Sequence, residues 1–155
     1  AKIHKKLKSK LMLIGEGPDT ATATQMAQNY GLSKDVIFLG SRHDVASILS
    51  AGHLFLLPSE HESFGLAAME ALCCGVPAIG TYSTGLPELI DDNRSGFLCK
   101  IGDTDDMAEK AVRLLSDEDM WQSFSDYARK TVSEKFHYEK IVTQYENMYE
   151  KVLNK

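Results

Sequence analysis

The sequence contains no apolar run long enough to cross a membrane, and its first residues do not resemble a signal peptide. It also contains few cysteines. Cys73, Cys74 and Cys99 are an odd number without regular spacing, which excludes a disulfide framework and indicates a reducing compartment. We therefore expect a cytoplasmic protein without a membrane span, in which these thiols pack as small hydrophobic groups.

Clusters of metal ligands are absent as well. The five histidines show no ligand spacing, and the D-x-D pattern Asp103-Thr104-Asp105 stands at the expected start of a helix, where aspartate caps the first turn. We predict no metal ion and no cofactor. The net charge of −5 argues against nucleic-acid binding. The first ten residues hold five lysines and no acid, which is typical of a solvated helix face rather than of a nucleic-acid or membrane arm.

What the sequence does contain is a regular alternation of apolar strands and helices. Apolar runs bounded by turn residues predict strands at 10–14, 36–39, 54–57, 76–81 and 97–99. Helical spacing and capping residues predict helices at 19–30, 44–51, 66–74, 86–90, 103–115, 117–136 and 137–153. Strands separated by helices form parallel sheets with right-handed crossovers. We therefore predict one α/β domain over residues 1–155, with a Rossmann-like, doubly wound sheet and helices at its C-terminus.

The stretch from 59 to 77 stands out in this pattern. Residues 66–74 are apolar except for Glu70, so we expect a helix in the middle of the fold that carries one anomalous carboxylate. Glu62 lies eight residues earlier, and the N–H groups between it and the helix would form an anion-binding helix start. Two interpretations stay open: a ligand site flanked by two acceptors, or a capping Glu62 with Glu70 paired to a Lys or Arg.

The loops that leave the predicted strands meet at one edge of the sheet. They begin at Gly15, at Gly40, at Ser59 and at Thr81, each of which follows or ends an apolar run. In doubly wound sheets, ligands bind beyond the carboxyl ends of the strands. The arrangement therefore indicates a ligand site along this edge.

The spacing of Glu62 and Glu70, with Phe64, Gly65, Ala71, Gly75 and Pro77 around them, resembles the E-x7-E signature of retaining family 4 glycosyltransferases. The resemblance implies the C-terminal half of a GT-B fold, which binds the donor sugar nucleotide. It implies that Glu62 is catalytic and holds hydroxyls of the donor hexose, and that Glu70 binds the ribose hydroxyls. It also implies that four residues line the diphosphate and sugar: Ser63, Phe64, Gly65 and Leu66.

The resemblance extends to the other loops of the predicted edge. Gly15 and Gly17, in Gly-Glu-Gly-Pro, match the family's G-x-G-P loop beside the donor, although a plain turn stays open as an alternative. Ile37 and Arg42 fall where the family binds the nucleotide base. The sequence 85–88 resembles the family's G-G-x-P-E, with Thr84 in place of the first glycine.

Four segments, at 59–66, 74–81, 96–104 and 140–146, are most similar to family members that transfer N-acetylglucosamine from UDP to L-malate in bacillithiol biosynthesis. The partners implied are a UDP-sugar donor and a small-molecule acceptor. The family's opening strand, its Arg/Lys phosphate loop and its acceptor-binding N-terminal domain have no counterpart in the sequence. We therefore expect a fragment that is inactive alone and has an exposed sheet edge. A homo-oligomer, an epimerase-like domain and a non-catalytic nucleotide-binding or interaction module stay open.

Overall fold

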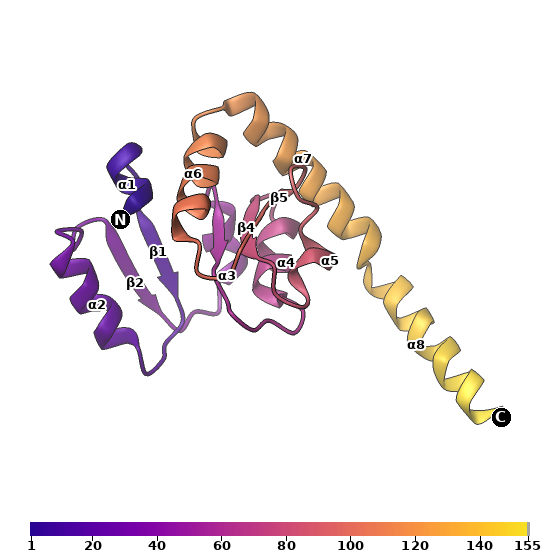
Figure 1. Ribbon diagram of the computed structural model, residues 1–155. Coiled ribbons are helices and arrows are strands. Elements are labelled where there is room, and N and C mark those ends of the chain that lie inside the picture. The colour runs from indigo at the N-terminus through magenta and orange to yellow at the C-terminus, as the bar shows by residue number, and fades with distance from the viewer. Residues whose placement is uncertain (155) are drawn as a thin grey trace.

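A computed structural model describes residues 1–154 as alternating strands and helices (Figure 1). The strands are β1 (Leu11–Ile14), β2 (Val36–Gly40), β3 (Phe55–Leu57), β4 (Ala78–Thr81) and β5 (Gly96–Cys99). The helices are α1 (Lys2–Lys6), α2 (Thr20–Asn29), α3 (Val45–Ser50), α4 (Leu66–Cys73), α5 (Leu86–Leu89), α6 (Thr104–Leu115), α7 (Glu118–Lys135) and α8 (Tyr138–Leu153). The predicted α/β class is confirmed, and every predicted element is present within two residues of its expected ends.

The strands form two parallel sheets instead of the single sheet that the sequence predicted. In one sheet β1 pairs with β2, and in the other β4 lies between β3 and β5. Figure 1 shows the two sheets beside each other, with the β1 and β2 arrows pointing to the lower side of the view, where α6 also begins. Within residues 1–154 no strand pairs with a strand of the other sheet.

The core surrounds β4 and β5, whose residues are all buried. Successive side chains of a strand point to opposite faces, so Ala78 packs with the α4, α5 and α7 residues of one cluster, and Ile79 packs with α6 in another. Burial on both faces explains the nearly continuous apolar runs in these strands. The three-stranded sheet is therefore the rigid support for the loops that follow β3, β4 and β5.

The basic N-terminus forms a short helix whose lysines face the acids of α6. Lys2 Nζ lies 2.7 Å from Asp105 Oδ1, and Lys6 Nζ lies 3.8 Å from Glu109 Oε1. No residue of α1 is buried. The interpretation of this stretch as a solvated helix face is confirmed.

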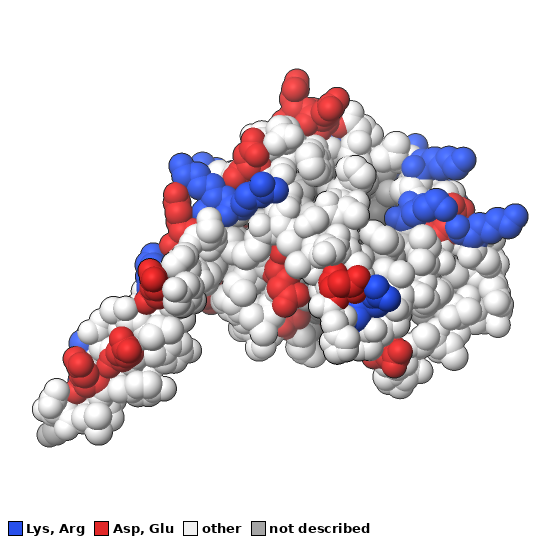
Figure 2. All heavy atoms as spheres, turned by 180° about the vertical axis from the view of Figure 1, so that it is seen from behind, with Lys and Arg blue, Asp and Glu red and all other residues white. Residues whose placement is uncertain are grey.

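The C-terminal helices differ in how they are covered. The predicted span 117–136 is one helix, α7, which packs against α4. Helix α8 extends away from the body as an arm (Figure 1), and no residue of it is buried. An apolar groove of about 690 Å³ runs along its first half, lined by residues that include Phe64, Phe136 and Tyr145. Much of the arm is uncharged in Figure 2.

None of the helices in residues 1–154 has the length and apolar character that crossing a membrane requires.

Candidate nucleotide-sugar site

Helix α4 begins at a glycine whose conformation and surroundings both exclude a side chain. Gly65 has φ of 91°, in the left-handed region, and a Cβ at this position would lie 2.6 Å from Leu86 Cδ2. Leu86 opens α5 and is itself fully buried. The start of α4 therefore packs directly against α5, where the loop between β3 and α4 ends.

Glu62 caps this turn with both its side chain and its backbone. Its Oε1 accepts a hydrogen bond from the Gly65 N–H at 3.0 Å, and its carbonyl oxygen accepts one from the Gly85 N–H at 3.1 Å. The side chain is half-buried. The capping interpretation of Glu62 is confirmed, and the other carboxylate oxygen makes no hydrogen bond to residues 1–154, so capping and ligand binding are compatible.

Glu70 is exposed, and the expectation of a helix sealed in the middle of the fold was wrong. Only one side of α4 is buried, by Ala68, Ala71 and Leu72, while the opposite side, which carries Leu66 and Glu70, faces solvent. Leu66 is 63% exposed. The expectation failed because short apolar residues such as alanine line the exposed side and conceal it in the sequence.

The alternative interpretation of Glu70 was also wrong. No Lys, Arg or His within residues 1–154 lies close enough to the Glu70 carboxylate for an ion pair. The carboxylate is therefore available as a hydrogen-bond acceptor, three helical residues beyond the exposed Ala67 and eight residues after Glu62. Ser63 and Leu66 are exposed on the same rim, whereas Phe64 is half-buried and Gly65 is buried.

The loop predicted to lie beside the donor and the loop predicted to hold its base form a second unit on the other sheet. The Gly15 N–H donates to the Gly40 carbonyl at 2.8 Å and joins the ends of β1 and β2. Gly15 has φ of 114°, and neither Gly15 nor Gly17 has a neighbour within 4 Å of where a Cβ would lie, so the backbone there is open. No hydrogen bond or ion pair of the described chain joins this unit to the Glu62 loop.

Ile37 and Arg42 lie in or next to this second unit. Ile37 is 37% exposed on β2. The Arg42 guanidinium makes two 2.8 Å hydrogen bonds to Asp44, which lower the pKa of Asp44 and raise the pKa of Arg42. The pair is exposed, so its charges attract each other only weakly through solvent. The Arg42 guanidinium is therefore engaged with Asp44, and its role at the base stays a prediction.

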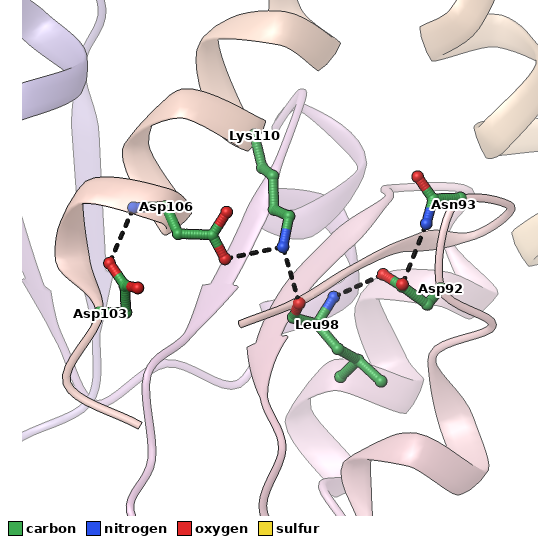
Figure 3. Close-up of polar contacts among 6 residues, drawn as sticks. All are labelled: Asp92, Asn93, Leu98, Asp103, Asp106 and Lys110. Atoms are coloured by element: carbon green, nitrogen blue, oxygen red, sulfur yellow. Dashed lines mark hydrogen bonds and ion pairs between the residues drawn. The ribbon is translucent and has the colours of Figure 1, made fainter. Parts of the chain in front are cut away.

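The D-x-D pattern caps helix α6, as its position predicted. Asp103 Oδ1 accepts from the Asp106 N–H at 3.0 Å (Figure 3), and Asp105 pairs with Lys2. Within the described chain no three of His, Cys, Asp and Glu gather as metal ligands. In the same view, Lys110 donates to Asp106 at 2.7 Å and to the Leu98 carbonyl at 2.9 Å, which fastens α6 to β5.

The cysteines differ from one another in burial. Cys99 is buried, and desolvation raises its pKa to about 12. Cys74 packs beside a small core cluster, but Cys73 is exposed on the open side of α4, which corrects the expectation that all three pack. Partial burial, and then the neighbouring Cys74 and Glu70, raise the pKa of Cys73. The Cys73 and Cys99 thiols are therefore poor nucleophiles at neutral pH.

One contact that shapes the site was missed in the sequence. The Thr81 hydroxyl, at the end of β4, donates to the Ser59 carbonyl at 2.5 Å, at the start of the loop that carries Glu62. Thr81 is 1% exposed. The available signal was a polar residue that ends an otherwise apolar strand.

Comparison with known proteins identifies relatives over almost all of the chain. Residues 1–131 match the family of "Glycosyl transferases group 1". The chain is 45% identical over 153 residues to the N-acetyl-alpha-D-glucosaminyl L-malate synthase of Bacillus anthracis, covering 99% of this chain and 40% of that enzyme. The chain thus spans two fifths of the length of this relative.

Solved structures share the fold. The sucrose-phosphate synthase of Thermosynechococcus elongatus superposes with a TM-score of 0.90 and 26% identity, over 99% of this chain and 41% of that one. TarM of S. aureus, in a complex with alpha-GlcNAc-glycerol and UDP, superposes with a TM-score of 0.90 and 25% identity, over 96% of this chain and 30% of that one. With the family match over residues 1–131 and the malate-synthase relative, these similarities lead to one conclusion: the chain belongs to the group 1 glycosyl transferases.

Proposed function

We propose that this chain is the donor-binding part of a retaining glycosyltransferase, which moves N-acetylglucosamine from UDP-N-acetylglucosamine to a small acceptor, L-malate, in bacillithiol biosynthesis. One observation carries the proposal. The start of α4 lies between two carboxylates, of which Glu62 keeps one oxygen free of hydrogen bonds to residues 1–154 and Glu70 is exposed and without an ion pair there. Such a rim offers donors to an anion and acceptors to hydroxyl groups.

The proposed roles follow from the position of each group. Unpaired N–H groups at a helix start favour phosphate, so the diphosphate of the donor would lie at the exposed backbone of Ser63 and Leu66. Glu62 would accept hydroxyls of the hexose, and Glu70 those of the ribose. The base would lie at the second unit, where Gly15 and Gly17 leave the backbone open.

We propose that the chemistry is front-face displacement of UDP, with retention at the sugar. Backbone donors aimed at the leaving diphosphate stabilise the charge that develops as the glycosidic bond breaks. This mode of catalysis requires no protein nucleophile. No divalent metal enters the proposed mechanism, because the aspartates of the D-x-D pattern are already engaged as a cap and an ion pair.

The relatives support the choice of donor and acceptor. The malate synthase of Bacillus anthracis, at 45% identity, is named for N-acetylglucosamine and L-malate, and the TarM complex contains UDP and a GlcNAc derivative. We further propose that the 155 residues are a fragment whose acceptor-binding domain lies in a longer protein, and that they bind nucleotide without turnover. The free thiols fit the cytoplasm as the proposed compartment.

A titration followed by amide chemical shifts tests the donor site. UDP and UDP-N-acetylglucosamine are expected to shift the amides of Ser63, Gly65 and Glu70, whereas inorganic phosphate at the same concentration shifts few or none of them. Shifts confined to the groove along α8, or equal shifts with phosphate alone, would contradict the proposal. Transfer of N-acetylglucosamine to L-malate by the 155-residue chain would contradict its status as an inactive fragment.

A substitution then tests the ribose role. Glu70→Ala is expected to weaken UDP binding by about 1–3 kcal/mol, roughly 5- to 150-fold in Kd, because hydrogen bonds to a charged acceptor are lost. Glu118→Ala is the matched control, since Glu118 is also an exposed helical glutamate but lies at the start of α7. Equal affinities of the two variants in the same titration would rule out Glu70 as a ligand.

A further inference from the structure

The end of β4 and the loop that follows it hold the loop that carries Glu62 at two points. The Thr81 hydroxyl donates to the Ser59 carbonyl at 2.5 Å, and the Gly85 N–H donates to the Glu62 carbonyl at 3.1 Å. Gly65 adds a third point, because its N–H donates to the Glu62 side chain at 3.0 Å. The loop is thus bonded at its start, at Glu62 and at its junction with α4.

The backbone that follows β4 packs closely against the loop that carries Glu62. A Cβ on Gly85 would lie 2.4 Å from the Ser63 carbonyl oxygen and 2.5 Å from Phe64 Cα, so the two backbones touch without room for a side chain. Thr81 is 1% exposed, and its hydroxyl also lies 3.4 Å from Ser83 Oγ, which is itself buried. The approach of the two loops is therefore determined by backbone and by one buried hydroxyl, not by flexible side chains.

The Thr81 hydroxyl is not needed to fill space. Valine has nearly the same shape as threonine and would suit a strand end that is otherwise apolar, whereas a buried hydroxyl is tolerated only when it is hydrogen-bonded. What the hydroxyl adds is a bond to the Ser59 carbonyl, in a loop of eight residues, 58–65, without helix or strand. Ordering such a loop at the moment of binding costs conformational entropy at each of its residues, so a loop that is already ordered binds more tightly.

We propose that Thr81 is a positioning residue for the donor site. It does not touch the donor but fixes the start of the loop, so that Glu62 and the N–H groups at the start of α4 face the rim before the nucleotide arrives. This inference rests on the proposed function. It extends that function by assigning a residue of β4 to the preorganisation of a site formed by the β3–α4 loop.

Three substitutions of Thr81 test the role of its hydroxyl. Thr81→Val keeps the shape and removes the hydroxyl, and we expect it to weaken UDP binding about 5- to 30-fold. It should also speed hydrogen exchange of the Gly65 and Gly85 amides in the unliganded chain, since both amides bond to Glu62. Thr81→Ser keeps the hydroxyl and should restore both properties. If Thr81→Val does not fold, the comparison of Thr81→Ala with Thr81→Ser takes its place.

The two readouts separate this inference from the proposed function. Wild-type chain that does not bind UDP would overturn the function, while the exchange rates of Gly65 and Gly85 would still test the anchoring by Thr81. Wild-type binding combined with unchanged affinity and unchanged exchange in Thr81→Val would overturn the inference alone. A uniform rise in exchange over β4 and α7 would also overturn it, because that result assigns to Thr81 only a role in global stability.

Discussion

At the scale of single residues, Asp91 joins the end of α5 to α7. It follows α5, and its carboxylate accepts from the Tyr127 hydroxyl at 2.8 Å and from Lys135 Nζ at 3.2 Å, both on α7. Partial burial acts to raise the pKa of Asp91, but the hydrogen bonds from Tyr127 and Lys135 outweigh it and hold the pKa below its ordinary value of 3.8. The ionised carboxylate is therefore the form that the fold prefers.

This preference makes the stability of the fold depend on pH. Because the pKa is lower in the folded than in the unfolded chain, the contribution of Asp91 is present above pH 3.8 and is lost as the pH falls through the folded pKa. Asp91→Asn should lower the free energy of unfolding by about 0.5–1 kcal/mol at pH 7. In urea unfolding, the difference from wild type should shrink as the pH falls below 3.8.

Asp126→Asn is the control for this measurement. Asp126 lies on the exposed side of α7 and accepts only from Gln122, a contact that asparagine can keep. We expect little change at either pH. A difference between Asp91→Asn and wild type that stays the same from pH 7 to pH 3 would show that the charge of Asp91 does not contribute.

At the scale of elements, the C-terminus of α4 is capped by α7. Gly75, with φ of 75°, ends the helix, and its carbonyl accepts from Ser125 Oγ at 2.6 Å. Arg129 Nη2 donates to the Cys74 carbonyl at 3.2 Å. The last carbonyls of a helix have no partner within the helix, so these two side chains supply what α4 lacks. The orientation of α4, and with it that of Glu70, thus depends on α7.

Ser125→Ala is the prediction at this scale. The substitution leaves the Gly75 carbonyl without its buried donor, and we expect the free energy of unfolding to fall by about 1–3 kcal/mol. Ser133→Ala is the matched control on the same helix, because the Ser133 hydroxyl is exposed and bonds only to carbonyls of its own turn. Chemical denaturation should show the loss for Ser125 alone, and an equal effect of the two variants would contradict the interhelical cap.

At the scale of the whole molecule, the two sheets differ in how well they are covered. All residues of β4 and β5 are buried, whereas in β1 Leu11 is 42% and Met12 is 38% exposed. Within residues 1–154, β1 and β2 each pair on one side only. The two-stranded sheet carries the proposed base site, whereas the three-stranded sheet carries the proposed diphosphate and sugar site. The two parts of the donor site therefore rest on sheets of unequal stability.

Native-state hydrogen exchange should resolve this difference. Amides of β1 and β2 are expected to exchange on the order of 100-fold faster than those of β4, because regions with little burial open locally while the core opens only on global unfolding. Added UDP should slow exchange in both sheets if it contacts both. Identical rates for β2 and β4 in the unliganded chain would instead indicate that the two sheets unfold as one unit.

Much of this structure could be predicted from residues that act locally. Apolar runs determine the strands, and Gly31 and Gly75, both with positive φ, end helices where the sequence indicated. The aspartate at 103 caps a helix as its position requires. Burial was predicted less well, since the exposed side of α4 and the single-sided pairing of β1 depend on what packs against each element.

The sequence alone determined the order of strands and helices, the family, and the presence of two glutamates eight residues apart around a helix start. It could do so because hydrophobic period, turn residues and motif spacing are properties of neighbouring residues. Only the tertiary structure decided that the Glu62 carbonyl is bonded to Gly85, that Glu70 is exposed and unpaired within residues 1–154, and that Thr81 holds the loop from β4. These features depend on contacts between residues 20 or more positions apart or on the direction in which a helix faces, and no local pattern encodes either.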